Sequence, residues 1–389
     1  MKAIRSLVAI TAVLTIALSA TLAVAADKSS EKKAKPKKDV PRIQMAILLD
    51  TSGSMSGLIN QARTQLWTIV NEFATAKRNG KTPHLEVALY EYGKSSLPAK
   101  EGYMRMIVPL TDNLDQVSDE LFKLTTNGGS EYCGQAIDLA VRELDWSEAN
   151  KDLKCIFIAG NEPFTQGPIN FRDACKAAVS KNITVSTIHC GTESDGLNGQ
   201  WDQGAKLADG SFLNIDHDRA VASIAAPQDK ELAELSGKLN TTYLAYGSAD
   251  NKRLGTTLQS AQDANAAGAA PAAAAARAKT KASSFYRNSS WDLLDAVKEG
   301  KVKLEEMKEE ELPDDLKKLK PEERKAYLAE KEKERAEIQA RIQELSKARD
   351  AYLVDARKKA AEAGAETLDT AIIKTVRDQA ERLEFEFKE

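Results

Sequence analysis

The chain has 389 residues, of which 42% are hydrophobic, and its formal net charge is −3. This length accommodates one α/β domain of ordinary size together with a further segment. The slightly negative charge argues against a nucleic-acid-binding protein, which needs a basic surface. The three histidines are scattered, without a carboxylate or cysteine at ligand spacing, so they do not suggest a catalyst.

The first 26 residues have the pattern of a secretory signal peptide. Lys2 and Arg5 precede an apolar run that leads into small residues ending at Ala26. We therefore expect export to a periplasm, a cell envelope or the extracellular space, with no integral membrane span after cleavage. Removal of these two cations changes the net charge from −3 to −5. An uncleaved membrane anchor is the alternative. Residues 27–40, rich in lysine and proline, are expected to form a charged, solvated tether.

Residues 44–54 (QMAILLDTSGS) combine an apolar run with an acid and two serines. The run predicts a buried parallel strand, and Asp50 follows at its carboxyl end, where open α/β sheets bind ligands. Ser52 and Ser54 add hydroxyl oxygens to this carboxylate. Such hard donors suit Mg²⁺ or Mn²⁺. The alternative is a turn whose serines only cap the following helix.

Three enzymatic interpretations of the same residues fail on residue type. A phosphoryl-transfer aspartate enzyme needs a second carboxylate two residues after Asp50, where Ser52 stands. A nucleophile elbow needs serine at the centre of residues 53–57, where Met55 stands, and the Gly-Lys-Ser/Thr of a phosphate loop is absent. We therefore expect that the protein is not an enzyme.

The segments that follow alternate between helix and strand. Helical spacing of apolar residues marks residues 58–77, 113–124, 171–181, 201–208 and 231–239, and strand patterns mark 84–92, 103–110, 154–159, 183–189, 211–215 and 242–246. This alternation predicts an α/β fold with a doubly wound, mostly parallel sheet flanked by helices. We place this domain at residues 41–249.

A second candidate metal loop lies at residues 125–134 (TTNGGSEYCG). Its two glycines allow close backbone approach, and its hydroxyl and carboxylate groups offer oxygen ligands. Ser130 is the leading candidate, and Thr126 and Glu131 are alternatives. The residues are also compatible with a plain helix N-terminus, in which Ser130 caps the helix and Glu131 lies in its first turn.

These segments together resemble von Willebrand factor type A (vWA) domains, which have a Rossmann-like fold. The residues DTSGS match the D-x-S-x-S motif that opens the metal-ion-dependent adhesion site (MIDAS) of this family. Residues 128–130 (GGS) stand where the family commonly has Gly-Gly-Thr. The resemblance implies a site for Mg²⁺ or Mn²⁺ whose ligands are Asp50, Ser52, Ser54 and Ser130.

The chain departs from the family pattern after the strand at residues 154–159. Family members usually continue with Thr-Asp-Gly, whose Asp completes the metal site, but Gly160 occupies that position here. Asn161 and Glu162 are candidate substitutes, and the remaining alternative leaves the position to solvent. Fewer charged protein ligands would weaken cation binding.

Four cysteines lie within the predicted domain, and an exported chain permits them to form two disulfides. The expected positions at the two ends of the sheet suggest the pairs Cys133–Cys190 and Cys155–Cys175. Four buried free thiols are the alternative.

The C-terminal part has a different composition. Residues 250–284 are rich in alanine and are expected to form a linker, whereas residues 285–389 are charged and helical. A long helix is expected from Pro321 to about Ala363. We expect residues 370–387 to fold back on it as a helical hairpin, with a coiled coil to a partner or a second copy as the alternative.

The resemblance implies a divalent-cation-dependent protein-binding protein, an adhesion or scaffold protein whose metal captures an acidic residue of a protein partner. The C-terminal helices would then provide a scaffold, a second interaction surface or a means of self-association. Two alternatives are an accessory subunit of an envelope enzyme or assembly complex, and a structural protein in which the cation only stabilises the loops.

Overall fold

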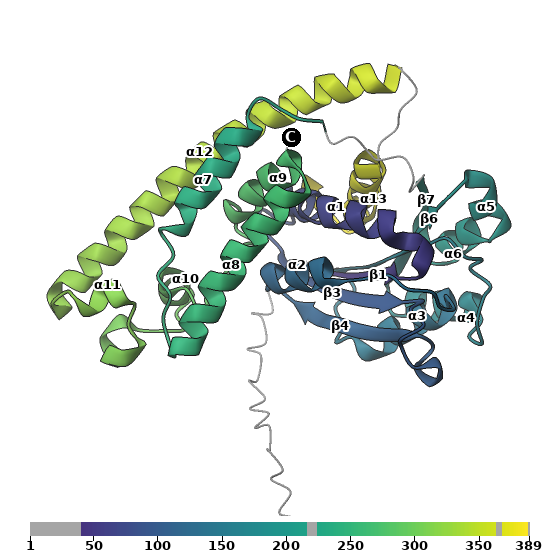
Figure 1. Cartoon of the computed structure of the whole chain (residues 1–389), viewed down its shortest axis with the longest axis horizontal. Coiled ribbons are helices and arrows are strands. Elements are labelled where there is room, and N and C mark those ends of the chain that lie inside the picture. The colour runs from purple at the N-terminus through teal and green to yellow at the C-terminus, as the bar shows by residue number, and fades with distance from the viewer. Residues whose placement is uncertain (1–39, 216–223, 363–367, 388–389) are drawn as a thin grey trace, which may run out of the picture. The chain divides into compact units, whose positions relative to one another are not determined.

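The computed structural model describes residues 40–215, 224–362 and 368–387 (Figure 1). The predicted signal peptide and nearly all of the predicted tether lie outside these residues. Within the described residues, no helix combines the length and the apolar character that a membrane span requires.

A six-stranded sheet forms the centre of the fold, in the order β4-β3-β1-β5-β6-β7. The strands are β1 (Arg42–Asp50), β3 (His84–Tyr92), β4 (Met104–Thr111), β5 (Leu153–Gly160), β6 (Thr184–Cys190) and β7 (Asp209–Ile215). All neighbours are parallel except β4, which pairs with β3 in the antiparallel sense at the sheet edge. The predicted fold class, a doubly wound and mostly parallel α/β sheet, is confirmed.

Strand β1 lies between β3 and β5, and its apolar residues point alternately to the two faces of the sheet. Met45 and Leu49 join one hydrophobic core, and Ala46 and Leu48 join the other. Parallel strands that are covered on both faces have such continuous apolar runs. The strand therefore carries Asp50, which is itself fully buried, to the carboxyl edge of the sheet.

Helices cover both faces of this sheet (Figure 1). One face is covered by α1 (Ser56–Thr75), α2 (Leu114–Lys123) and α13 (Leu368–Glu381), and the other by α3 (Cys133–Glu143), α4 (Phe171–Ser180) and α6 (Trp201–Leu207). A short helix, α5 (Glu193–Asn198), lies between β6 and α6 in the chain. Side-chain caps mark two of the helix starts, where Asn113 and Asn170 accept a hydrogen bond from a backbone N–H of the first turn.

The predicted disulfides are wrong, because all four cysteines are free and buried. Cys155 and Cys190 belong to the core on the α1 side of the sheet, whereas Cys175 belongs to the core on the α4 side. The Cys155–Cys175 pair is therefore separated by the sheet itself. The thiol of Cys133 instead contacts the hydroxyl of Tyr92 at 3.7 Å.

The predicted alanine-rich linker is also wrong, because this segment forms two packed helices, α8 (Ala249–Ala269) and α9 (Pro271–Lys281). The alanines of α9 are almost all buried, and the helix packs against α1, α8 and α7 (Asp229–Asn240). Small side chains let these helices approach closely. Asn71 in α1 donates a hydrogen bond to the carbonyl of Ala276 at 2.8 Å, within the buried contact.

The C-terminal helices pack differently from the predicted hairpin. Helix α12 (Pro321–Glu362) has nearly the predicted bounds and packs against α7 and α9. Helix α13 packs against α1 and β7, where Val376 and Ala380 complete the core of the sheet. The predicted fold-back of residues 370–387 onto the long helix is therefore wrong, since the apolar face of α13 is used by the sheet domain.

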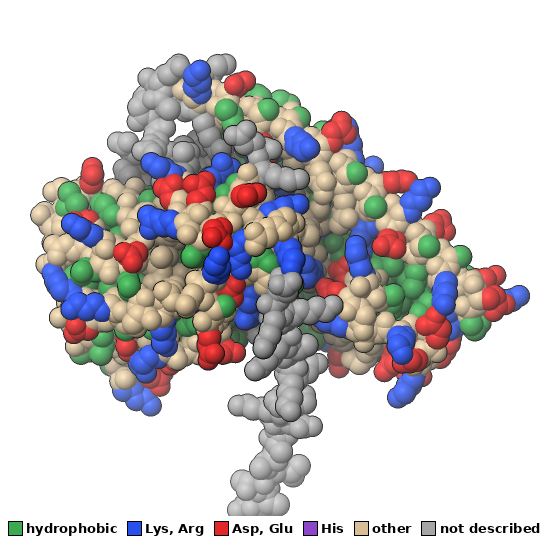
Figure 2. All heavy atoms as spheres, turned by 180° about the vertical axis from the view of Figure 1, so that it is seen from behind, with side chains coloured by type: hydrophobic (Ala, Val, Ile, Leu, Met, Phe, Trp, Pro, Cys, Tyr) green, Lys and Arg blue, Asp and Glu red, His purple; other side chains and the backbone are tan. Residues whose placement is uncertain are grey.

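The remaining elements are short. They are β2 (Ala76–Lys77) paired with β8 (Glu386–Phe387), helices α10 (Leu293–Lys298) and α11 (Asp314–Lys317), and the 3-10 turns η1 (Gly53–Met55), η2 (Ala99–Glu101), η3 (Leu304–Glu306) and η4 (Glu309–Glu311). The predicted strand at residues 242–246 is reduced to one bridge between Ala245 and Asp292. On the face shown in Figure 2, acidic and basic side chains are interspersed.

Candidate metal centre

Asp50 is the last residue of β1, and its side chain is fully buried. Its Oδ1 accepts a hydrogen bond from the backbone N–H of Ser52 at 2.7 Å, whereas its Oδ2 has no hydrogen-bond partner among the described residues. Burial, and to a smaller extent the negative charge of Glu162, raises the pKa of Asp50 to about 7. A buried carboxylate oxygen without a donor is costly unless a proton or a cation satisfies it.

The two predicted serines lie beside this carboxylate because the chain turns into η1 directly after β1. Ser52 is buried and Ser54 is exposed, and their hydroxyl oxygens are 3.2 Å apart. The hydroxyl of Ser54 also donates to Oδ1 of Asn161 at 3.4 Å, which brings the loop after β5 to the same place. The structure thus brings Asp50, Ser52 and Ser54 together, as their spacing predicts.

The loop at residues 125–132 closes the site from the other side. The backbone N–H of Asn127 donates to the carbonyl of Thr51 at 3.1 Å, and the N–H of Ser95 donates to the carbonyl of Gly128. Gly129 packs directly on the turn that follows β3, where an added Cβ would overlap the carbonyl of Gly93 and lie 2.8 Å from the nitrogen of Ser95. The loop is therefore held to two neighbouring loops by backbone contacts.

Gly129→Ala is expected to destabilise the protein by about 1–3 kcal/mol and to separate these loops, because its Cβ meets backbone atoms that are not free to move aside. Gly128→Ala is the matched control, since an added Cβ there has no atom within 4 Å. Urea denaturation of both variants measures the difference. Equal stability of the two variants would contradict the close packing at Gly129.

The same loop contributes Glu131, which is 6% exposed, whereas Ser130 is half-buried. Burial, together with the negative charges of Asp50 and Glu162, raises the pKa of Glu131 to about 7. No described hydrogen bond joins the Ser130 hydroxyl to Asp50, Ser52 or Ser54. The side chain of Glu131, an open alternative in the sequence, lies beside Asp50, because a Cβ at Gly93 would meet both the Glu131 side chain and the Asp50 carboxylate.

The unusual glycine after β5 has a structural explanation. A Cβ at Gly160 would lie 2.5 Å from the hydroxyl of Tyr92 and 3.1 Å from Oδ2 of Asp50. Tyr92 fills this space and donates a hydrogen bond to the carbonyl of Ala159 at 2.9 Å. An aspartate at position 160 would therefore not fit beside Tyr92. The sequence pattern does not indicate the contact of Tyr92 with this site, because a tyrosine in a strand pattern is typical of an ordinary core side chain.

The donor set fits a hard divalent cation. It contains a buried carboxylate oxygen without a partner, two adjacent hydroxyls and a second buried carboxylate, which are oxygen donors of the kind that Mg²⁺ and Mn²⁺ prefer. A cation would also offset the mutual repulsion of Asp50 and Glu131. Within the described part of the chain, no group of three or more His, Cys, Asp and Glu side chains is arranged to hold a metal.

This arrangement belongs to a class of Rossmann-like α/β domains that bind ligands at the carboxyl edge of the sheet. Within this class, residues 44–207 match the family model described as the von Willebrand factor type A domain, which covers less than half of the chain. The chain therefore contains a vWA domain, as its motifs predict. No curated protein sequence was found to match the chain.

Several solved structures are similar to part of the chain. They include the conserved hypothetical protein BatB from Bacteroides thetaiotaomicron, with 19% identity over 45% of this chain and 90% of that chain and a TM-score of 0.34. The SpRpn10 VWA domain has 17% identity over 45% of this chain and 88% of that chain, with a TM-score of 0.34. Proximal thread matrix protein 1 from the mussel byssus, described with a zinc-occupied MIDAS motif, has 13% identity over 46% and 43% of the two chains and a TM-score of 0.33.

Proposed function

We propose that this protein is a non-enzymatic, divalent-cation-dependent protein-binding protein, an adhesion or scaffold protein that captures an acidic residue of a partner. The observation that carries this proposal is the buried, unpartnered Oδ2 of Asp50 beside the paired hydroxyls of Ser52 and Ser54, at the carboxyl edge of a vWA domain. We propose Mg²⁺ or Mn²⁺ as the cation, since all of these donors are oxygen atoms.

The chemistry of the site supports this function. Asp50 supplies negative charge, while Ser52 and Ser54 donate only neutral oxygens, so a bound cation would retain the positive charge that attracts a carboxylate from another protein. Ser54 is exposed, so its hydroxyl, 3.2 Å from that of the buried Ser52, lies at the protein surface where a partner side chain can reach it. The signal-like N-terminal sequence leads us to propose that this binding occurs in the periplasm, at the cell envelope or in the extracellular space.

Asp50→Ala and EDTA are each expected to abolish capture of acidic peptides while the fold is retained. The probe is an array of immobilised peptides with a single Asp or Glu, each paired with its Asn or Gln counterpart. In millimolar Mg²⁺, the wild-type chain is expected to bind the acidic member of a pair at least about tenfold more tightly. We expect the fold to be retained without Asp50, because the substitution removes a buried charge that has no countercharge.

Asp173→Ala is the matched control, because this aspartate is exposed and lies on α4, away from β1. Thermal melting with and without Mg²⁺ separates two outcomes in the same samples. A melting temperature that rises with Mg²⁺ but no difference between acidic and neutral peptides would favour a purely stabilising cation. Peptide capture that survives both EDTA and Asp50→Ala would refute the proposed function.

A further inference from the structure

We propose that Glu131, and not Ser130, is the ligand that the second loop supplies to the cation, and that it replaces the carboxylate missing at Gly160. This inference rests on the proposed metal-dependent function and deepens it, since it concerns the same site. The second negative charge of the site then comes from the loop at residues 125–132. In the family motif it comes from the loop after β5.

The first argument is burial without a countercharge. Glu131 is 6% exposed, and no Lys or Arg forms an ion pair with it among the described residues. Buried carboxylates are normally paired with a cation or coordinate a metal. Its backbone N–H donates to Oε1 of Gln166 at 2.7 Å, which holds the residue in place while leaving the carboxylate uncompensated.

The second argument is that Glu131 and Asp50 converge on one glycine. A Cβ at Gly93 would lie 2.7 Å from Oδ1 of Asp50 and 2.9 Å from Cγ of Glu131. Gly93 has a φ of +79°, which non-glycine residues rarely adopt, and its N–H donates to the carbonyl of Tyr103 at 2.9 Å. The turn after β3 thus allows the two acids to approach each other over a backbone position that has no side chain.

The third argument concerns the other candidates. Position 160 has no room for an acidic side chain because of Tyr92. Glu162 is half-buried, and its carbonyl accepts a hydrogen bond from the indole of Trp201 at 2.9 Å, which holds its backbone at the edge of the site. The Glu131 side chain, by contrast, lies beside the Asp50 carboxylate, since a Cβ at Gly93 would meet both of them. Among these residues, Glu131 is the acid most closely integrated with the Asp50 cluster.

Mn²⁺ binding to the full chain tests this assignment, with isothermal titration calorimetry and the electron paramagnetic resonance signal of bound Mn²⁺ as two independent readouts. We expect one site in the wild-type chain and no binding by Asp50→Ala. Glu131→Gln is expected to weaken Mn²⁺ binding by about tenfold or more, because it removes a charged ligand at constant shape. Ser130→Ala, the neighbouring control, is expected to change the affinity by less than about twofold.

Glu131→Ala serves as a second variant, since it removes the carboxylate without leaving a buried amide to satisfy. Melting temperatures measured without metal verify that each variant is folded. If the wild-type chain binds no Mn²⁺, the proposed function fails together with this inference. If Asp50→Ala loses binding while both Glu131 variants bind like the wild type, the proposed function stands and the assignment of Glu131 is overturned.

Discussion

Replacement of Arg277 by alanine is expected to lower the free energy of unfolding by about 3–5 kcal/mol. Arg277 lies on α9, its side chain is 1% exposed, and it forms ion pairs with Asp115 of α2 and with Asp263 of α8, the latter at 3.0 Å. Its guanidinium also lies over the ring of Trp67, 4.6 Å from the centroid. The alanine variant leaves Asp115 buried without a countercharge, which is the costly outcome for a buried ion pair.

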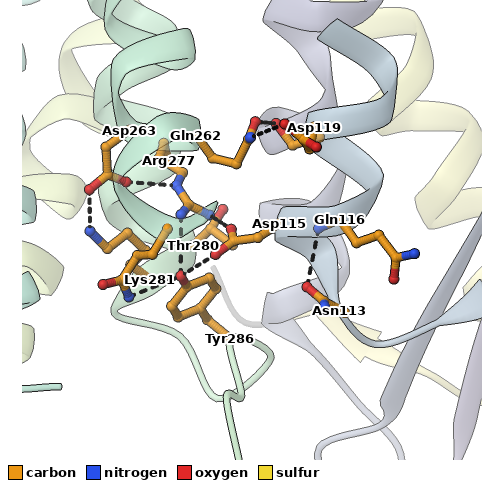
Figure 3. A network of polar contacts seen from close by, with 12 residues as sticks. Asn113, Asp115, Gln116, Asp119, Gln262, Asp263, Arg277, Thr280, Lys281 and Tyr286 are labelled. Carbon is orange, nitrogen blue, oxygen red and sulfur yellow. Dashed lines mark hydrogen bonds and ion pairs between the residues drawn. The ribbon is translucent and has the colours of Figure 1, made fainter. Parts of the chain in front are cut away.

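Figure 3 shows how this network joins α9 to the sheet domain. The hydroxyl of Tyr286 donates to Asp115 at 2.6 Å, and Arg277 donates to that hydroxyl at 3.2 Å. Lys281 contacts the other carboxylate, Asp263, at 2.7 Å. The network therefore joins α2, α8 and α9, and Lys281 extends it to α7 by donating to the carbonyl of Ser236 at 3.0 Å.

Urea denaturation measures this prediction, with Arg253→Ala as the matched control. Arg253 lies on α8 and forms an exposed pair with Asp250 at 3.5 Å, so its loss is expected to cost less than about 1 kcal/mol. The double variant Arg277→Met with Asp115→Leu removes both charges and should recover much of the lost stability. A cost for Arg277→Ala as small as that of the control would show that α9 is not anchored to α2.

Replacement of Arg335 by alanine is expected to cost a similar amount, about 3–5 kcal/mol near neutral pH. Arg335 connects α12 to the segment before α10, where it donates to Asp292 at 2.8 Å and to the carbonyl of Thr242 at 2.7 Å. Its guanidinium lies 4.1 Å from the centroid of the Tyr243 ring. Without Arg335, two neighbouring aspartates, Asp292 and Asp295, lose their common countercharge.

The cost of Arg335→Ala is expected to depend on pH. Burial, with a further contribution from Asp292, raises the pKa of Asp295 to about 6, while Arg335 opposes the rise and Glu299 adds to it. A folded-state pKa above the unfolded value means that the folded protein holds this proton more tightly, so stability falls as the pH rises from about 4 to 6. Loss of Arg335 raises this pKa further, and the variant should therefore differ from the wild type less at pH 5 than at pH 8.

Unfolding of both proteins at these two pH values measures the effect. Arg341→Ala, on the same helix, is the control, because Arg341 forms only partly exposed pairs, one of them with Glu231 at 2.8 Å. It is expected to show a small, pH-independent cost. A cost of Arg335→Ala that is the same at both pH values would rule out Asp295 as the titrating group.

Local sequence patterns were sufficient for the fold class of the sheet domain and for Asp50, Ser52 and Ser54 of the candidate site. The apolar run before Asp50 specifies a two-sided buried strand, and Ser52 and Ser54 follow within four residues, so their proximity needs no information from elsewhere in the chain. The alternation of helices and strands likewise specified a doubly wound sheet. The turn that holds Ser52 and Ser54 depends on residues close in sequence, and the alternation indicates only the class of the sheet, since pairing of distant strands such as β1 and β5 is a tertiary contact.

Tertiary structure decided everything that depends on which distant segments meet and on which face. Glu131 interacts with Asp50 because Gly93 and Tyr92, from a different strand, leave room for one acid and exclude another at position 160. The composition of the alanine-rich segment predicts a linker, because no local pattern indicates which element would cover it. In the structure its small side chains let α9 pack closely between α1 and α7. Spacing along a chain determines the type and the apolar face of an element, but the neighbour that covers this face is chosen by packing with the whole fold.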